Sequence, residues 1–248
     1  MNLNHKGDNE YKEMLYEGKA KRIFKTPAAQ EFFLEFKDSL TAFNALKKGS
    51  FENKGIVNRD IAALLFEYLE KFSIPSHYLR KENQNGMLVK KVTIIPFEVV
   101  VRNVLAGSTA KKLGIDEGTP LSEPLVEFYF KKDELGDPFV SEEQMRIIHQ
   151  IPVRDIEVMK ELALKINKKL TELFAEIKIK LVDFKVEFGK DSNSMILLAD
   201  EITPDCCRLW DMETNEKLDK DRFRRDLGSV KESYESVLAR LTQNRRGK

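Results

Sequence analysis

The clearest alternation of apolar and charged positions in this chain surrounds Lys185. Asp183, Lys185 and Glu187 occupy every second position, and the positions between them are apolar. Successive side chains of a strand point to opposite faces, so this spacing predicts a strand with one charged face and one buried face. A turn-rich gap follows, and an apolar run at residues 195–199 then ends at Asp200. The pattern therefore predicts a hairpin that brings a further acid back toward the first charges.

Acids gathered by such a hairpin would repel one another across neighbouring strands. A divalent cation bridging carboxylates to phosphate oxygens would relieve that repulsion, and Mg²⁺ selects oxygen ligands. An antiparallel hairpin with one solvated face alternates in the same way without any catalytic role. However, the run at 195–199 is apolar without alternation, and it leads into a turn that carries Asp205, Arg208 and the only tryptophan, Trp210. These two features favour a functional site over a solvated hairpin.

Weaker patterns indicate a β-rich first third and a mixed remainder. Short apolar runs predict strands at residues 14–17, 20–25, 31–36 and 87–92, and i, i+3, i+4 spacing from Ile61 to Phe72 predicts one helix among them. The remainder is predicted to contain strands at 97–102 and 126–130, a short helix from Ser141, a long amphipathic helix over 153–177 and the hairpin. One closing helix is predicted after the hairpin, with Asp219 as its N-cap and with Leu227 and Leu241 on its buried side.

Strands and helices mixed without regular alternation predict an α+β fold with two lobes. Pro96 and the apolar strand after it place the boundary near Ile95, giving a small β-rich lobe over residues 1–95 and a larger α/β lobe over residues 96–248. A cleft between lobes is a common position for a ligand.

Composition narrows the functional classes. A formal net charge of +1 gives no global field that favours nucleic acid or an anionic membrane, and no apolar run approaches the ~20 residues that span a bilayer. The first ten residues lack the apolar segment of a secretory signal. The adjacent pair Cys206 and Cys207 cannot build a disulfide framework, and the three histidines are scattered. A cytoplasmic protein without a zinc site is expected.

A glycine-containing turn with several cations lies near the N-terminus. Gly18 would let the backbone approach a phosphate closely, and Lys19 and Lys21 would offer compact positive charge to its oxygens. The segment matches no standard phosphate-binding loop, and a basic exposed hairpin turn is an equally good interpretation. Lys90, on the predicted strand at 87–92, could reach a nucleotide phosphate as in kinases, or could simply protect a sheet edge.

A second anion site is suggested where the strand at 97–102 ends. Arg102 precedes a small-residue turn and a helix beginning at Ser108, whose hydroxyl and free backbone N–H groups could bind a phosphate or carboxylate that Arg102 also contacts. The alternative is an ordinary helix cap beside a surface arginine. Arg208 and Arg224 leave the same choice open between ligand contact and surface salt bridge.

Taken together, these segments resemble one known family. Asp-x-Lys-x-Glu-x-Gly at 183–189 and the segment Asp-Glu-Ile-Thr-Pro-Asp-Cys-Cys-Arg-Leu-Trp at 200–210 are similar to two signatures of the SAICAR synthetases (phosphoribosylaminoimidazole-succinocarboxamide synthases). The resemblance extends to 16–21, to 102–108 and to 219–224, so it covers nearly the whole chain in the expected order.

The resemblance implies an ATP-dependent ligase of purine biosynthesis. Such an enzyme joins L-aspartate to the carboxylate of carboxyaminoimidazole ribonucleotide (CAIR) and gives SAICAR, ADP and phosphate. It also implies a kinase-like nucleotide lobe over a larger lobe resembling ATP-grasp-type folds, a Mg²⁺ cofactor, and a cytoplasmic homodimer that binds no nucleic acid or membrane. The alternatives are another carboxylate–amine ligase or small-molecule kinase on the same scaffold, or a non-catalytic nucleotide- or RNA-binding protein.

The resemblance also implies roles for individual residues. It places the ATP phosphates over Gly18, Lys19, Ala20 and Lys21 with help from Lys90, and magnesium on Glu187 and Asp200. It assigns the ribonucleotide to Arg102, Ser108, Asp183, Lys185 and Arg208, catalysis to Lys185, Asp205 and Arg208, and an anionic substrate group to Arg224.

The chain departs from the family pattern in one region. Ser39 stands where many members have a second acid after Asp38, and Ala45 and Asn53 replace two usual glycines. These departures leave the role of the Asp38 loop open.

Overall fold

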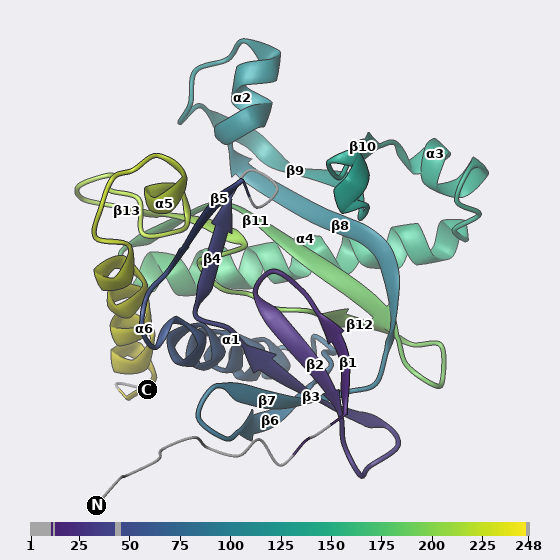
Figure 1. Ribbon diagram of the computed structural model, residues 1–248. Coiled ribbons are helices and arrows are strands. Elements are labelled where there is room, and N and C mark those ends of the chain that lie inside the picture. The colour runs from purple at the N-terminus through teal and green to yellow at the C-terminus, as the bar shows by residue number, and fades with distance from the viewer. Residues whose placement is uncertain (1–10, 12, 43–45, 247–248) are drawn as a thin grey trace, which may run out of the picture.

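Two antiparallel sheets and three long helices dominate the computed structural model of the chain, which describes residue 11, residues 13–42 and residues 46–246 (Figure 1). The residues around Asn44 and Ala45, the first ten residues and the last two of the basic tail lie outside this description.

The β-rich first third forms a five-stranded sheet in the order β1-β2-β3-β7-β6. Its strands are β1 (Met14–Glu17), β2 (Lys21–Lys25), β3 (Glu31–Phe36), β6 (Tyr78–Glu82) and β7 (Gly86–Lys90). The four strands expected here are confirmed with small shifts of their ends. The sequences of β6 and β5 (Lys47–Ser50) are mainly polar, and the alternation in β4 (Ser39–Ala42), which pairs with β5 in a separate ribbon, spans only four residues. These three strands were therefore missed.

Helix α1 (Lys54–Glu70) packs against this sheet and begins seven positions earlier than the apolar spacing from Ile61 indicated. The first two turns of α1 lack the full apolar spacing because Lys54 and Asn58 are buried there for polar contacts. The carboxylate of Asp38 accepts the backbone N–H groups of Asn53 (3.2 Å) and Gly55 (2.8 Å). Asp38 therefore fixes the start of α1.

The second sheet has the order β10-β9-β8-β11-β12, with β13 also paired to β11. Its strands are β8 (Thr93–Val104), β9 (Pro120–Phe130), β10 (Phe139–Val140), β11 (Ile179–Lys190), β12 (Ile196–Ala199) and β13 (Cys207–Asp211). The predicted hairpin is confirmed as β11 and β12. All four residues of β12 are buried, as its lack of alternation indicated.

Helices cover the second sheet and connect its strands. The long helix α4 (Val153–Glu176) packs its apolar stripe on β8, β9 and β11, as its amphipathic pattern predicted. The shorter elements are α2 (Gly107–Leu113), the 3-10 turn η1 (Asp133–Leu135) and α3 (Glu142–Ile147). The short helix expected from Ser141 is confirmed, and Ser141 and Gln144 form a capping box at its start.

The single closing helix predicted from Asp219 is wrong. The chain forms a one-turn helix α5 (Asp221–Arg224) and then a separate helix α6 (Val230–Arg246). Gly228 and Ser229 adopt positive φ angles of 69° and 48°, which interrupt a right-handed helix and leave Leu227 exposed. The Asp219 carboxylate instead accepts the N–H groups of Leu209 and Asp221, each at 2.7 Å.

One hydrophobic cluster runs from the first sheet to helix α6, which packs beside α1 (Figure 1). The mixed α+β class is confirmed, and the arrangement is compatible with the expected two lobes. The division at residues 95/96 stays a prediction, since β8 begins at Thr93 and continues across it. Within the described residues, no helix is long and apolar enough to cross a membrane, and both cysteines are free.

Candidate active site

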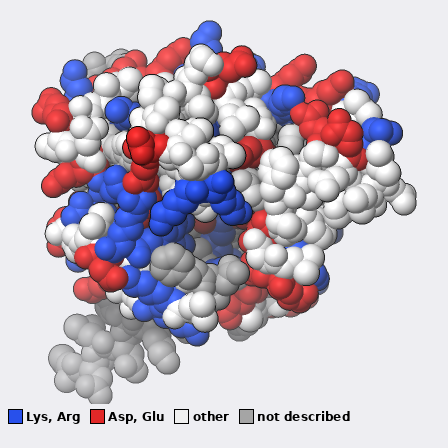
Figure 2. Space-filling model, turned by 90° about the horizontal axis from the view of Figure 1, so that it is seen from above, with Lys and Arg blue, Asp and Glu red and all other residues white. Residues whose placement is uncertain are grey.

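A pocket of about 840 Å³ opens between the two sheets. Lysine and arginine side chains gather around a hollow on the face seen from above (Figure 2). Every site residue expected from the sequence lines this pocket, although the residues come from opposite ends of the chain: Gly18, Lys19, Ala20, Lys21, Lys90, Arg102, Ser108, Asp183, Lys185, Glu187, Asp200, Asp205, Arg208 and Arg224. The fold brings them together, and their individual roles stay predictions.

Lys185 lies at the centre of a cluster of acids. Its ammonium nitrogen is 2.9 Å from Glu187 Oε1, 3.1 Å from Glu98 Oε1 and 3.6 Å from Asp200 Oδ2. Glu98 and Glu187 stand directly opposite each other on β8 and β11, a like-charge pair that repels. The expected repulsion between acids is therefore relieved by a lysine of the same strand.

Two further lysines contact these acids from other elements. Lys21 of β2 forms an ion pair with Asp200 and lies 2.8 Å from Glu201 Oε1, and Lys131, just after β9, lies 2.5 Å from Glu187 Oε2. Asp200 has a positive φ of 63°, a conformation that few residues other than glycine adopt and that clusters at functional sites. The acid cluster thus joins both sheets.

The charges of this cluster support one another. Burial alone would lower the pKa of Lys185, but Glu187, Asp200 and Glu98 outweigh it and raise that pKa well above its usual value. Burial would raise the pKa of Asp200, yet Lys21 and Lys185 hold it well below its usual value. Both groups are therefore charged across the neutral pH range.

The side chains of the acid cluster supply only part of the ligand shell that a divalent cation needs. Among the described residues, no three histidine, cysteine or acidic side chains are placed to hold one ion together. Glu187 and Asp200 offer carboxylate oxygens that face the same pocket. Mg²⁺ is usually held by one or two carboxylates with substrate phosphates and water completing its shell. The donor set fits Mg²⁺ on that basis.

Asp183 holds two arginines at the other end of β11. Its carboxylate accepts Arg102 Nη1 at 2.8 Å and Arg208 Nη1 at 2.8 Å. Arg102 is buried, and its other donors bind Glu127 at 2.6 Å and Tyr129 at 3.3 Å. Within the described residues, Arg208 Nη2 makes no hydrogen bond. Arg208 therefore keeps a donor for a pocket ligand, whereas Arg102 is largely occupied by protein groups.

The start of α2 lies against Arg208. A Cβ atom on Gly107 would come within 2.4 Å of Arg208 Nη2, so only glycine allows this approach, and its φ of 61° favours glycine as well. The sequence predicted free backbone N–H groups at the start of this helix. The first of them, that of Gly107, is instead occupied, because it donates to Glu117 at 3.3 Å. The Ser108 side chain lines the pocket beside this contact.

Asp205 joins α1 and α6 at a third side of the pocket. Its carboxylate accepts the ammonium of the fully buried Lys54, Asn58 Nδ2 at 2.9 Å and the Tyr234 hydroxyl at 2.9 Å. Burial would raise the pKa of Asp205, but Lys54 and the more distant Lys220 hold it well below its usual value. Asp205 is thus an anchored carboxylate with few free lone pairs.

Lys220 also lines the pocket near Asp205. Its nitrogen is 3.9 Å from Asp205 Oδ1 and forms no hydrogen bond to the described residues. Burial lowers the pKa of Lys220, partly offset by Asp205, and the charges of Arg224 and Lys54 lower it further. Lys220 and Arg224 both line the pocket, and Arg224 Nη1 also forms an ion pair with Asp221 Oδ1 at 2.5 Å.

The glycine turn closes the pocket from the first sheet. The Gly18 N–H donates to the Lys21 carbonyl at 2.8 Å, and Lys19 reaches Asp133 at 2.8 Å across the opening. Ser39 donates its hydroxyl to the Lys19 carbonyl at 2.9 Å. The divergent Ser39 thus supports the turn that carries the candidate phosphate ligands.

Several pocket residues were missed in the sequence: His77, Glu98, Lys131, Glu201 as a partner of Lys21, and Lys220. Lys54, which does not line the pocket but is the buried partner of Asp205, was also missed. Glu98 lies on the strand predicted at 97–102, but its position opposite Glu187 follows only from the pairing of β8 with β11. Lys131 and Lys54 have no local signal, because their partners are more than 50 positions away in sequence.

Comparison with known proteins gives one consistent family. The family model described as SAICAR synthetase matches residues 14–241. The phosphoribosylaminoimidazole-succinocarboxamide synthase of Caldanaerobacter subterraneus is 53% identical over 234 residues, which cover 94% of this chain and 99% of that relative.

Solved structures agree. The crystal structure of the synthase of that name from Ehrlichia chaffeensis aligns with a TM-score of 0.91 at 49% identity, covering 93% of this chain and 98% of that one. A SAICAR synthetase in complex with ADP aligns with a TM-score of 0.90 at 44% identity and the same two coverages.

Proposed function

The chain belongs to the SAICAR synthetase family, and from this premise we propose that the pocket between its two sheets carries out the ligation. The enzyme is an ATP-dependent carbon–nitrogen ligase of purine biosynthesis that joins L-aspartate to the carboxylate of CAIR, with SAICAR, ADP and phosphate as products.

The chemistry requires activation of a carboxylate. An oxygen of the CAIR carboxylate attacks the γ-phosphorus of ATP, which forms an acyl phosphate and releases ADP. The aspartate amine, after losing a proton, then attacks the carbonyl carbon; a C–N bond forms and the C–O bond to phosphate breaks. Attack of an anion on an anion makes positioning and cationic screening the main contributions of the protein.

ATP is placed against the first sheet. The turn from Gly18 to Lys21 lies over the pocket with Lys90 on the adjoining wall, and the relative with ADP supports a nucleotide in this fold. Lys21 forms ion pairs with Asp200 and Glu201. We assign Lys21 to the phosphates, because its ammonium already lies at the junction of the two sheets.

We assign Mg²⁺ to Glu187 and Asp200. When bound there, it would neutralise phosphate charge during phosphoryl transfer. Lys185 lies between these two acids and Glu98, so it can screen the CAIR carboxylate as that group approaches the γ-phosphate. The acids in turn hold Lys185 protonated.

The ribonucleotide is placed along β11. Its reacting carboxylate must lie near Lys185, so its phosphate would lie at the far end, between the Ser108 hydroxyl and the free Nη2 of Arg208. Asp183 holds the Arg208 guanidinium in place, and Arg102 holds Asp183. Arg102 thus acts mainly through Asp183.

We assign aspartate to Lys220 and Arg224. Two carboxylates need two cationic partners, and both side chains face the pocket on the side of Asp205. Asp205 would keep Lys220 directed into the pocket.

The observation that carries this proposal is the ion-pair cluster around Lys185, which joins the nucleotide side and the ribonucleotide side in one pocket. The test measures ADP release from ATP and Mg²⁺ with CAIR and aspartate each added or withheld. ADP that requires CAIR, together with a SAICAR mass when aspartate is present, is the expected result. ADP release that ignores CAIR would refute the substrate assignment, and a stable phosphorylated product without aspartate dependence would indicate a kinase.

We further propose a cytoplasmic homodimer. Exposed apolar side chains at Leu135, Phe139, Ile147 and Ile148 fall in one stretch of the chain and could be covered by a second copy. Light scattering at micromolar concentration would give a monomer mass if this is wrong.

A further inference from the structure

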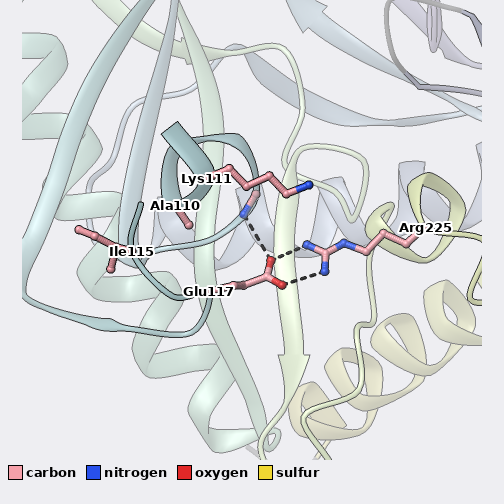
Figure 3. Close-up of a pocket in the computed structure, with 6 residues that line it drawn as sticks. Ala110, Lys111, Ile115, Glu117 and Arg225 are labelled. Atoms are coloured by element: carbon pink, nitrogen blue, oxygen red, sulfur yellow. Dashed lines mark hydrogen bonds and ion pairs between the residues drawn. The ribbon is translucent and has the colours of Figure 1, made fainter. Parts of the chain in front are cut away.

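Glu117, in the loop between α2 and β9, joins the start of α2 to Arg225, which follows α5 (Figure 3). Ser108 of α2 and Arg224 of α5 both line the pocket of about 840 Å³, here called the main pocket. Its Oε2 accepts Arg225 Nη1 at 2.8 Å, and its Oε1 accepts Arg225 Nη2 and the backbone N–H of Gly107 at 3.3 Å. Figure 3 shows the carboxylate between the arginine fork and the start of α2. This is a bidentate pair, which fixes geometry as well as charge.

The contacts continue from Arg225 to Arg208. Arg225 Nη2 lies 3.4 Å from Asp221 Oδ2, and the same oxygen accepts Arg208 Nε at 3.0 Å. Asp221 is almost fully buried, so its position is fixed by packing. A chain of polar contacts therefore runs from Gly107 through Glu117, Arg225 and Asp221 to Arg208.

The chain of contacts closes on itself, because Gly107 also lies directly against the Arg208 guanidinium. Neither Glu117 nor Arg225 is among the residues lining the main pocket, so neither is placed to contact a substrate there. Arg225 holds the pKa of Glu117 at about 2, which keeps the carboxylate ionised at any working pH. The ring thus links the segments of two pocket-lining residues, Ser108 and Arg208, through polar contacts.

We propose that Glu117 and Arg225 are positioning residues that hold the start of α2, with Ser108, at a fixed distance from Arg208 and so set the affinity for the ribonucleotide phosphate. The inference rests on the proposed function, which places that phosphate between Ser108 and Arg208. An isolated surface ion pair would contribute little. Because this ion pair belongs to a closed ring of contacts, its loss should instead weaken the binding of one substrate, the ribonucleotide.

The test is calorimetric binding of CAIR and, separately, of ADP to the full-length enzyme and to Glu117→Gln, Arg225→Gln and the double variant. Glu142→Gln, which removes a carboxylate from a remote surface pair with Lys160, is the matched control. We expect the Kd for CAIR to rise roughly tenfold in each single variant, by analogy with the lower end of what is lost when a hydrogen-bond partner behind a metal ligand is removed. The double variant should be no weaker than the singles, and the Kd for ADP and the unfolding temperature should stay near wild type.

Unchanged CAIR affinity in both single variants would overturn the proposal. Equal weakening of CAIR and ADP together with a lower unfolding temperature would also overturn it, because that is the result of general destabilisation. Wild-type enzyme that binds ADP but no CAIR would instead refute the proposed substrate, and the positioning role would fall with it.

Discussion

The side-chain nitrogen of Lys21 lies 2.8 Å from Glu201 Oε1, although 180 positions separate the two residues. Lys21 is the first residue of β2, an inner strand of the first sheet, and Glu201 lies two positions after the end of β12. The same nitrogen pairs with Asp200. This contact joins the two sheets across the active-site pocket, at the position where nucleotide phosphates and a divalent cation are proposed.

Asp200→Asn should nearly abolish turnover while the fold stays intact. A neutral amide can neither replace a metal-bound carboxylate nor balance Lys21 and Lys185, so kcat should fall more than about a hundredfold. Steady-state SAICAR formation and circular dichroism give the two readouts. Asp226→Asn, at an exposed acid paired with Lys47, is the control and should keep wild-type kcat. Wild-type turnover in Asp200→Asn would remove Asp200 from the site.

Lys185→Met should impair the activation of the carboxylate more than the binding of nucleotide. The ammonium lies among three acids and would screen the CAIR carboxylate during transfer, whereas the ATP phosphates are assigned to other lysines. Rapid-quench measurement of ADP formation in a single turnover should show a rate lowered about a hundredfold. The Kd for ADP should change less than about threefold. Lys185→Arg keeps the positive charge, so its single-turnover rate should fall less than that of Lys185→Met. An unchanged single-turnover rate would refute this role.

Lys54→Met should lower the free energy of unfolding by about 3 kcal/mol, because it leaves the Asp205 carboxylate without its buried cationic partner. Urea unfolding gives the value. Lys231→Met removes an exposed lysine 3.9 Å from Glu235 and should cost at most about 0.5 kcal/mol. Adding Asp205→Asn to Lys54→Met should restore part of the loss, since it removes the unpaired charge. A loss below about 1 kcal/mol in Lys54→Met would contradict the buried pairing.

His77 should make the protein sensitive to mild acid. Burial lowers its pKa from 6.5 to about 4, partly offset by Asp200, and its Nε2 lies 3.1 Å from the Asp200 carbonyl. Between pH 4 and pH 6.5, His77 binds a proton in the unfolded chain but not in the folded chain. The free energy of unfolding is therefore unaffected by His77 above pH 6.5 and falls as the pH drops toward 4. The loss from this residue at pH 5 should be about 2 kcal/mol.

Unfolding curves of wild type and His77→Gln at pH 7.5 and pH 5 test this expectation. The glutamine keeps a donor for the Asp200 carbonyl but cannot take up a proton, so the variant should lose less stability at pH 5 than wild type. His149→Gln, at a partly exposed histidine, is the control. Equal acid sensitivity in wild type and His77→Gln would contradict the buried neutral state.

Local pattern was enough to find most of the elements that hold the site. Period-two spacing found β11, because apolar and charged residues alternate from Val182 to Phe188, and sustained helical spacing found α4, because it carries an apolar stripe. Spacing failed at β6, whose sequence is mainly polar, and at the last helix, where the apolar pattern continues through Gly228 although the backbone does not. The spacing of apolar residues indicates which face of an element is buried. It does not indicate where the backbone angle φ becomes positive and ends a helix.

The sequence by itself determined the chemistry that the site residues can perform: two carboxylates for a cation, lysines for phosphates, arginines for anions, and the order of motifs that marks the family. Only the tertiary structure decided which charges meet. Lys21 with Glu201, Lys54 with Asp205 and Arg225 with Glu117 are pairs separated by more than a hundred positions. Such pairs form because the packing of sheets and helices brings distant segments together, and no local pattern encodes that distance.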